Sequence, residues 1–272
     1  MKKGPKILLV DIETAPIFSH VWGLFDNNVS LNQIVKDWHL LSWSAKWLDD
    51  KEVIYSKNRK PTIMYDDQSK KSNIENDKEL VKGIWALLDE ADIVIGQNSK
   101  RFDIKKLNAR FIFHGMQPPS SFRQLDTLVI SKKHFAFTSN KLEYLTDKLC
   151  TRYKKLKHNK FSGHELWNQC LRNNKEAWAE MKKYNTHDVL STEELYYKLI
   201  PWENSLNFNV YNDSLELKCT CGSEKFISKG YHYNNTGKFS RHKCKSCGSE
   251  IKGKVNLLDK EKRDSLMKGT IR

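Results

Sequence analysis

The stretch at residues 6–14, with the sequence KILLVDIET, decides the fold of this 272-residue chain. Its four consecutive apolar residues, 7–10, predict a β-strand that is covered on both faces. Two carboxylates follow, and because side chains alternate along a strand, Asp11 and Glu13 point to the same side. Two like charges on one side are tolerated when a divalent cation lies between them, and oxygen ligands suit Mg²⁺ or Mn²⁺. The alternative is a strand that simply ends in solvated acids.

Composition predicts a folded protein with no membrane span. Apolar residues make up 39% of the chain and aromatic residues 11%, and no apolar run approaches the ~18 residues that a membrane helix needs. Asp11 and Glu13 interrupt the apolar run near the N-terminus before any cleavage site, so we expect no secretory signal. The expected location is the cytoplasm.

The charge balance favours a polyanionic partner. The formal net charge is +14 and the pI is near 9.4, so nucleic acid is favoured over a membrane, because no basic amphipathic helix stands out. A lysine-rich codon bias is the alternative explanation. Residues 201–272 hold 14 Lys and Arg against 8 Asp and Glu, so the positive charge is denser there than in residues 1–200.

Hydrophobic periodicity predicts alternating strands and helices after the first strand. Leu80, Ile84, Leu87 and Leu88 recur at helical spacing after Asp77. Further strands are expected at residues 20–25, 40–47, 52–56, 91–96 and 122–130. Further helices are expected at residues 103–114, 140–149, 165–171 and 175–199, the second capped by Ser139 or Asn140. Loops are expected at residues 57–76 and 151–163, the latter basic and near the substrate.

Two further stretches carry acids. In residues 94–107, VIGQNSKRFDIKKL, a buried strand delivers Asn98 to its end, Phe102 is expected to anchor the turn in the core, and Asp103 starts the next helix. In residues 184–189, YNTHDV, Tyr184 and Asp188 are four apart and face the same way on a helix. Each residue also has a structural explanation, because Asp103 suits a helix cap, Tyr184 a core aromatic and Asp188 a solvated acid.

Taken in order, the motifs DIET, NSKRFD and YNTHD resemble the three motifs of DEDD-superfamily 3′–5′ exonucleases, in the tyrosine (DEDDy) branch. The middle motif, G-x-N-x-x-x-F-D, is most similar to the proofreading domains of family B DNA polymerases. The resemblance spans residues 5–200, and no polymerase domain follows, as in stand-alone phage-type proteins. It implies an α/β, ribonuclease H-like fold in which helices flank a mixed β-sheet.

The resemblance also implies a two-metal mechanism for phosphodiester hydrolysis, with two Mg²⁺ or Mn²⁺ ions. Asp11 would bridge both ions, Glu13 and Asp188 would hold the ion that activates water, and Asp103 would support the other. Tyr184 would orient the water, because a phenol with a pKa near 10 is a poor base but a good hydrogen-bond partner.

The remaining expectations concern substrate contacts. The histidine branch of the superfamily has a histidine five residues before its last aspartate, where this chain has Lys183, so His187 is expected to face away from the acids. A substrate contact by His187 is the weaker alternative. The candidate substrate-binding residues are Thr14, Asn98, Phe102 and Lys141.

Four cysteines in the final quarter indicate a second metal site. Cys219 and Cys221 form one tight pair and Cys244 and Cys247 another, each followed by a glycine that lets backbone amides turn toward sulfur. Four thiolates fit one structural Zn²⁺ in a zinc ribbon similar to those of phage and transposase proteins. A histidine ligand, His242, and a disulfide are the alternatives. The two other cysteines, Cys150 and Cys170, are expected to be buried thiols.

Between the cysteine pairs, aromatic and basic residues interleave. Tyr231, Tyr233 and Phe239 suit base stacking, and the neighbouring lysines and arginine suit phosphate contacts. The alternative is that these aromatics form the small core of the ribbon, because so short a module needs every apolar residue it has.

The sequence therefore predicts a metal-dependent 3′–5′ exonuclease that acts on DNA, with single-stranded ends as the expected substrate and RNA as the alternative. The predicted domains are an exonuclease domain at residues 1–203, a linker at 204–214, a zinc ribbon at 215–256 and a basic tail at 257–272. Two other functions stay open, a non-catalytic nucleic-acid-binding protein and a structure-specific endonuclease on the same fold. Protein partners are not predicted.

Overall fold

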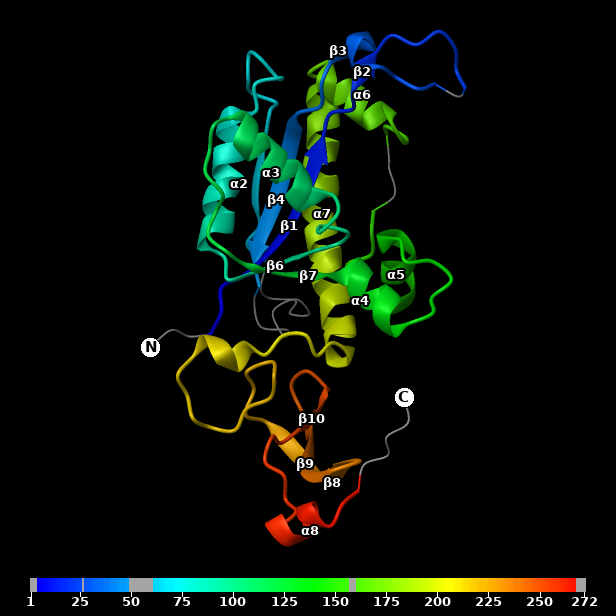
Figure 1. Cartoon of the computed structure of the whole chain (residues 1–272). Helices are drawn as coiled ribbons and strands as arrows, with labels where there is room; N and C mark the ends of the chain where they lie inside the picture. Colours follow the sequence, from blue (N-terminus) through cyan, green and yellow to red (C-terminus); the bar gives the residue numbers. More distant parts are fainter. Residues whose placement is uncertain (1–3, 26, 49–60, 157–159, 268–272) are drawn as a thin grey trace. The chain divides into compact units, whose positions relative to one another are not determined.

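The computed structural model describes residues 4–25, 27–48, 61–156 and 160–267 (Figure 1). The chain divides into two compact units. The larger unit is Lys6–Lys198, and the smaller one combines Met1–Pro5 with Leu199–Arg272. The predicted domain boundaries at 203/204, 214/215 and 256/257 stay predictions. No helix in the part of the chain that the structure describes is long and apolar enough to cross a membrane.

The larger unit is built on a mixed sheet of five strands. The strands are β1 (Ile7–Thr14), β4 (Leu40–Trp47), β5 (Met64–Asp67), β6 (Ile93–Gly96) and β7 (Arg123–Asp126), in the order β5-β4-β1-β6-β7. β1, β6 and β7 run parallel, whereas β4 pairs antiparallel with β1 and with β5. The predicted α/β fold with a mixed sheet is confirmed.

Helices cover both faces of this sheet (Figure 1). They are α2 (Lys78–Glu90), α3 (Asp103–Phe113), α4 (Thr127–His134), α5 (Leu142–Leu149), α6 (Glu165–Leu171) and α7 (Lys175–Leu199). One core cluster joins β1 and β4 to α2 and α3, and another packs α6 and α7 around Ala15 and Leu41. Figure 1 shows α2 and α3 on one side of the sheet and α7 on the other.

Alternation along β1 assigns its side chains to these two faces. Leu8, Val10 and Ile12 belong to the core cluster with α2 and α3. Asp11 and Glu13 therefore point to the face that α7 covers. The expectation that both acids point to one side is confirmed, because residues of α6 and α7 contact both of them.

Most predicted elements are present within a few residues of their expected ends. The strands expected at 40–47 and 91–96 are β4 and β6, and the helices expected at 103–114, 165–171 and 175–199 are α3, α6 and α7. Asp77 occupies the N-cap position of α2, as predicted. Gly115, just after α3, has φ +69°, which suits a glycine at a helix end.

The strand predicted at residues 20–25 is wrong. Strand β2 (Phe18–Ser19) ends before this stretch and pairs with β3 (Ile34–Lys36), which follows a short 3₁₀ helix, η1 (Leu31–Gln33). The apolar residues that suggested a strand are exposed, and Trp22 is fully so. No neighbouring strand of the described chain covers them, so the apolar pattern did not report burial. The strand expected at 52–56 lies outside the described residues.

Three other expectations need correction. The loop predicted at 57–76 contains β5, an edge strand that pairs with β4. The strand predicted at 122–130 ends at Asp126, because the Asp126 side chain accepts a hydrogen bond from Leu128 N at 2.9 Å and caps α4. Neither Ser139 nor Asn140 is the N-cap of α5, since Lys141 occupies that position without a side-chain cap bond.

The smaller unit contains a three-stranded antiparallel sheet in the order β10-β9-β8. Its elements are η2 (Ile200–Trp202), η3 (Phe208–Tyr211), β8 (Phe226–Asn234), β9 (Gly237–Cys244), β10 (Glu250–Lys252) and α8 (Lys260–Asp264). The segment expected to be a linker contacts the first cysteine pair, because Phe208 N donates to Thr220 O at 2.7 Å and Asn209 Nδ2 donates to Cys219 O at 2.8 Å.

Candidate functional site

Asp11 and Glu13 lie at the carboxyl end of β1, in the centre of the sheet. In the pairing with β4 they stand opposite Ser44 and Ser42, and the register shifts between Glu13 and Thr14. Such a shift bends a strand and re-aims the side chains next to it. Both carboxylates are half-buried, so they lie beyond the apolar core but are not fully exposed to solvent.

Two polar side chains on the α7 face hold these carboxylates. Asn185, on α7, donates through Nδ2 to Asp11 Oδ2 and lies within 3.3 Å of Asp11 O. Trp167, on α6, donates through Nε1 to Glu13 Oε2 at 3.2 Å. The first and third acidic motifs are therefore joined directly, although they are more than 170 residues apart.

Asp103 joins the same site from the N-terminus of α3. It is buried, and its Oδ1 accepts a hydrogen bond from Ile12 N at 3.1 Å. The preceding turn is held by Asp126, which accepts from Asn98 N at 2.8 Å and from Lys100 N at 3.1 Å. A Cβ at Gly96 would lie 2.6 Å from Ser99 Cβ, so glycine is needed for this turn to close over the strand end.

Asp188, on α7, is paired with a lysine. Lys155 Nζ lies 2.8 Å from Asp188 Oδ2, and it also lies 4.7 Å from the centre of the Tyr184 ring. Tyr184 in turn makes an edge contact with Trp167, with ring centroids 6.2 Å apart. Tyrosine and aspartate thus face the same side of α7, as their four-residue spacing predicts.

The segment that delivers Lys155 is fixed to α7 at two places. The fully buried Glu194 accepts hydrogen bonds from Thr151 N at 2.8 Å and Tyr153 N at 2.7 Å. His187 Nε2 lies 2.6 Å from Lys154 O. Burial would raise the pKa of Glu194, but the backbone amides of residues 151–153 hold that pKa below its usual value. The ammonium group of Lys155 is therefore placed by contacts with residues on both sides of Asp188.

Burial and mutual repulsion shift the acids strongly. Burial, then the charges of Asp188, Asp103 and Glu13, raise the pKa of Asp11 well above its usual value. Burial and Asp188 raise the pKa of Glu13 to about 8, and burial raises that of Asp103 to about 7. Without a cation, this site therefore holds protons near neutral pH.

The charge of Asp188 also shifts the pKa values of Tyr184 and Lys155. Burial and the charge of Asp188 raise the pKa of Tyr184 to about 12, so this phenol is neutral and can donate a hydrogen bond. Burial would lower the pKa of Lys155, but Asp188 and Tyr184 raise it above its usual value, so the ammonium group stays charged.

The donor set fits a hard divalent cation. Carboxylates are ligands that Mg²⁺ and Mn²⁺ prefer, and a cation would replace the protons that Asp11, Glu13 and Asp103 hold. In the described part of the chain, only the four cysteines have donor atoms that all lie within 4.8 Å of one another. The four carboxylates do not form such a group, and Asp188 is paired with Lys155.

The other residues that the sequence singled out lie on several different elements of the larger unit. Thr14 ends β1, and Asn98 occupies the turn after β6 with φ 61°. Phe102 does not anchor the turn in the core, since 38% of its surface is exposed. Lys141 is exposed at the N-cap position of α5, where its N donates to Ser139 Oγ at 3.3 Å. His187 Nε2 contacts the backbone oxygen of Lys154, which agrees with the expectation that His187 faces away from the acids.

Sequence reasoning missed three residues of this site, Lys155, Trp167 and Asn185. Lys155 lies in the basic stretch that was expected to be a loop near the substrate, but nothing in that stretch distinguishes it from its neighbours. Asn185 directly follows Tyr184 in the sequence, and a helical residue one position away from Tyr184 is not expected to face the same side. Only the packing of α6 and α7 against β1 brings Trp167 and Asn185 to the carboxylates, and only the contacts of residues 151–154 with α7 bring Lys155 to Asp188.

Residues 54–200, more than half of the chain, match the family model of the RNase_H superfamily. The chain belongs to this superfamily. The matched region contains Asp103, Tyr184 and Asp188, whereas Asp11 and Glu13 precede it. Hydrolysis of nucleic acids is the class of activity that membership in the RNase_H superfamily supports.

Among solved structures, the chain is similar to the family B DNA polymerase from the hyperthermophilic archaeon Pyrobaculum calidifontis, with 14% sequence identity and a TM-score of 0.49. The match covers 73% of this chain and 25% of the polymerase chain, so the RNase_H-superfamily chain spans about a quarter of the polymerase's length. No curated protein matches the chain.

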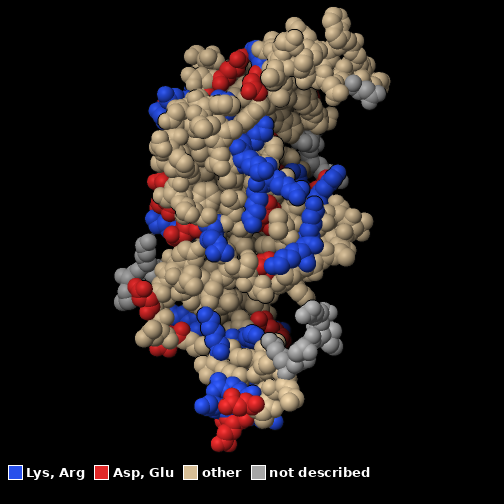
Figure 2. Space-filling model, in the orientation of Figure 1, with Lys and Arg blue, Asp and Glu red and all other residues tan. Residues whose placement is uncertain are grey.

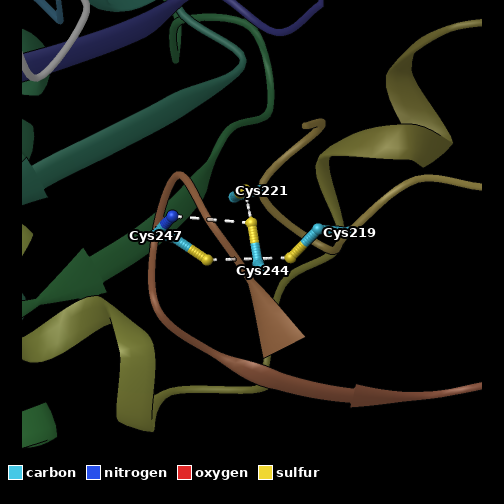
Figure 3. A group of neighbouring side chains, drawn as sticks. All are labelled: Cys219, Cys221, Cys244 and Cys247. Carbon is cyan, nitrogen blue, oxygen red and sulfur yellow. Dashed lines mark hydrogen bonds between the residues drawn. The ribbon is translucent and has the colours of Figure 1, made fainter. Parts of the chain in front are cut away.

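The smaller unit of this RNase_H-superfamily chain has a candidate zinc centre (Figure 3). Cys219 Sγ lies 3.6 Å from Cys247 Sγ, and Cys221 Sγ lies 3.7 Å from Cys244 Sγ, so none of these pairs is a disulfide. Amides turn toward sulfur, with Cys247 N donating to Cys244 Sγ and Ser249 N to Cys247 Sγ. Hydrogen bonds from Cys219 and Cys221 hold the pKa of the Cys247 thiol below its usual range.

The four cysteines fit the predicted tetrahedral site. Gly222 and Gly248 follow the two pairs and have φ +88° and +83°, which lets each turn wrap its sulfurs. His242 contacts the Phe226 ring, with centroids 5.1 Å apart, and is not in the cysteine group. Cys150 and Cys170 are buried free thiols, as expected.

Proposed function

We propose that this chain is a metal-dependent 3′–5′ exonuclease that hydrolyses phosphodiester bonds of DNA, with single-stranded ends as its substrate. The observation that carries this proposal is the meeting of Asp11, Glu13, Asp103 and Asp188 from β1, α3 and α7. These acids are buried or half-buried, and the charges of Asp188 and Asp103 raise the pKa values of Asp11 and Glu13, so the site is built to hold positive charge. Membership in the RNase_H superfamily supports the same reaction class.

The roles of the four acids follow from their positions. The charges of Asp188, Asp103 and Glu13 all raise the pKa of Asp11, so Asp11 is close to each of the other acids. We therefore assign it to both ions. Glu13 and Asp188 would hold one ion and Asp103 the other. Two bound Mg²⁺ or Mn²⁺ ions supply an activated water and neutralise the charge on the leaving 3′ oxygen.

The other residues position these groups. Asn185 and Trp167 fix the rotamers of Asp11 and Glu13, and Ile12 N fixes that of Asp103. Tyr184 would orient the attacking water as a neutral donor, since its pKa is about 12. Lys155 brings a charged ammonium group beside Asp188, where the phosphate of the substrate would lie. Thr14, Asn98, Phe102 and Lys141 remain the proposed contacts to the strand.

The surface charge suits a polyanion. Figure 2 shows Lys and Arg side chains gathered on the face of the larger unit where α3, α4 and α5 lie. Lys100, Arg101 and Lys105, at the start of α3, are exposed, and so are Lys154 and Lys160 in the segment around Lys155. Such residues would contact phosphates of a strand that enters the acidic site.

For the smaller unit we propose a structural Zn²⁺ held by Cys219, Cys221, Cys244 and Cys247, and a second contact with nucleic acid. Tyr231 and Tyr233 are exposed on β8, and Lys238 Nζ lies 3.9 Å from the centre of the Tyr231 ring. Phe239 has a different place, because its ring packs against Gly237. The aromatics are therefore divided between a stacking surface and the small core of the ribbon.

The test uses the full chain with short single-stranded DNA or RNA, labelled at either end, in Mg²⁺ or in EDTA. A 3′–5′ exonuclease leaves a ladder of shortening products from the 5′-labelled strand and releases a labelled mononucleotide from the 3′-labelled strand. Asp103→Asn keeps an oxygen for Ile12 N and should abolish both products, whereas Glu143→Gln, on the exposed side of α5, should not. Hydrolysis that survives in EDTA or in Asp103→Asn would refute the proposal.

A further inference from the structure

The segment between β1 and β4 carries exposed apolar side chains that the acidic site does not use. Residues 17–35, called the arm below, include β2, η1 and the first two residues of β3. Trp22 is 101% exposed, Leu24 90%, Leu31 88% and Phe25 85%. The surface of a soluble protein rarely presents several large apolar side chains together unless they contact a ligand or a partner.

The arm is attached at the end of the sheet where the acids lie. Thr14 pairs with Leu40, and Ala15 N donates to His39 O at 2.9 Å, so the two ends of the arm are joined across β1 and β4. Glu13 is only one residue from this junction and stands opposite Ser42. The arm therefore begins next to the carboxylates that would perform hydrolysis.

The arm is ordered by its own polar bonds. His20 N donates to Gln33 O at 2.9 Å, and Gln33 Nε2 donates to His20 O at 3.0 Å. Ser30 N donates to Gln33 Oε1 at 2.9 Å. None of these bonds uses the side chain of Trp22 or Phe25, so the rings are presented outward by a scaffold that does not need them.

The charge of the arm indicates which part of a nucleic acid it would contact. Residues 17–35 contain no Lys or Arg and one carboxylate, Asp26. Lys36, the next residue, is paired with Glu75, so the arm itself offers no cation to a phosphate. The exposed Lys100 and Arg101 follow β6, which runs parallel to β1, and so lie toward the same end of the sheet. Phosphates would thus be held by the body of the protein, and the arm would supply ring faces.

We propose that Trp22 and Phe25 form a stacking surface for the bases of a single-stranded nucleic acid whose 3′ end occupies the acidic site. The inference rests on the proposed function, which it extends by assigning a place to the unpaired bases. Stacking on aromatic rings tolerates any base, so the arm would hold strands of varied sequence.

Binding of a 5′-fluorescein single-stranded oligodeoxynucleotide to the full chain in EDTA tests this surface by fluorescence anisotropy. Trp22→Ala and Phe25→Ala should each weaken binding about tenfold, and Trp22→Phe should restore most of the loss. Leu24→Ala and Leu31→Ala are matched controls, because they remove equally exposed apolar side chains without a ring, and should change the affinity less than twofold. The slope of log K against log[salt] should stay unchanged, because no phosphate contact is removed.

A second measurement uses an oligodeoxynucleotide made of abasic residues. Wild type and Trp22→Ala should bind it equally, because no base remains to stack. Equal losses in Leu31→Ala and Trp22→Ala would overturn the inference in favour of a protein-binding surface. A wild-type dimer in light scattering that Trp22→Ala converts to a monomer would overturn it in favour of a second copy.

The two proposals fail separately. If wild type degrades end-labelled DNA but Trp22→Ala and Phe25→Ala bind as tightly as wild type, only the stacking surface is refuted. If no hydrolysis occurs but the ring-specific loss of affinity is present, the surface stands and the exonuclease function falls.

Discussion

The ammonium nitrogen of Lys155 lies 2.8 Å from Oδ2 of Asp188. One residue comes from an irregular segment and the other from the middle of α7, and Glu194 and His187 on that same helix hold the backbone before Lys155. The third acidic motif is therefore not an isolated helix face. The helix that carries Asp188 also carries Glu194 and His187, which hold the segment of Lys155.

Replacing any acid of the quartet should end hydrolysis while leaving a folded protein. Asp11→Ala, Glu13→Ala, Asp103→Ala and Asp188→Ala each remove a proposed ligand, and a misplaced water is not tolerated in the reaction. Tyr184→Phe should slow turnover only about tenfold, which corresponds to one orienting hydrogen bond. Single-turnover rates and circular dichroism would measure both effects. Normal turnover in Asp103→Ala would refute the site.

Glu194→Gln should lower kcat because it loosens the segment that carries Lys155. The amide cannot accept all the backbone bonds that the carboxylate receives from residues 151–153, and unsatisfied buried donors cost about 1–3 kcal/mol each. We expect kcat to fall at least tenfold with a smaller change in KM.

A double-mutant cycle separates positioning from general damage. If Glu194 acts through Lys155, then Lys155→Ala and the double variant should have similar kcat values. Additive losses, or a KM effect larger than the kcat effect, would contradict the positioning role of Glu194.

The stability of the metal-free protein should fall as pH rises from about 4 to about 8. Glu13, with a pKa of about 8, and Asp103, with a pKa of about 7, bind protons more tightly in the folded than in the unfolded state. Unfolded carboxyls titrate near pH 4, so the folded state loses stability as pH rises through this window. Mg²⁺ should raise Tm most at pH 8, where it replaces lost protons.

Differential scanning calorimetry of wild type, Glu13→Gln and Glu143→Gln, each in EDTA and in Mg²⁺, measures this effect. Glu13→Gln should flatten the pH dependence, and Glu143→Gln should leave it intact. A pH dependence that is identical in wild type and Glu13→Gln would show that the carboxylate does not titrate as described.

Removal of one cysteine should unfold the ribbon and spare the larger unit. Thiolate ligation supplies much of the stability of such modules, so Cys244→Ser should lose amide protection in residues 215–256 only. Hydrogen exchange and zinc content would report the two consequences. Less than about half an equivalent of zinc in the purified wild type would count against the site.

A chain that ends at Trp202 should keep metal-dependent cleavage but bind nucleic acid more weakly. The acidic site lies in Lys6–Lys198, whereas residues 203–272 hold exposed aromatics and the same 14 Lys and Arg that follow residue 200. Each phosphate contact removed should flatten the slope of log K against log[salt] by nearly one unit for duplex DNA. Equal slopes for truncated and full-length Asp103→Ala proteins would show that the ribbon does not hold nucleic acid.

The sequence alone determined the local features whose cause lies within a few residues. The apolar run before Asp11 forms a buried strand wherever a sheet covers it, and the four-residue spacing of Tyr184 and Asp188 places them on one face of any helix. Each glycine that follows a cysteine pair predicted a turn, because glycine adopts positive φ without steric cost. The same logic failed at residues 20–25, where apolar composition did not mean burial.

Tertiary structure decided which of these local features meet. Trp167 and Asn185 have no sequence spacing that ties them to Asp11 or Glu13, and they reach those acids only because α6 and α7 pack on the face of the sheet to which β1 points its acids. Lys155 reaches Asp188 only because Glu194 and His187 of α7 hold the backbone before it. It also decided that Trp22 lies in solvent while Phe239 packs on Gly237. Burial depends on which elements become neighbours, and the free energy of that packing is spread over contacts far apart in the chain.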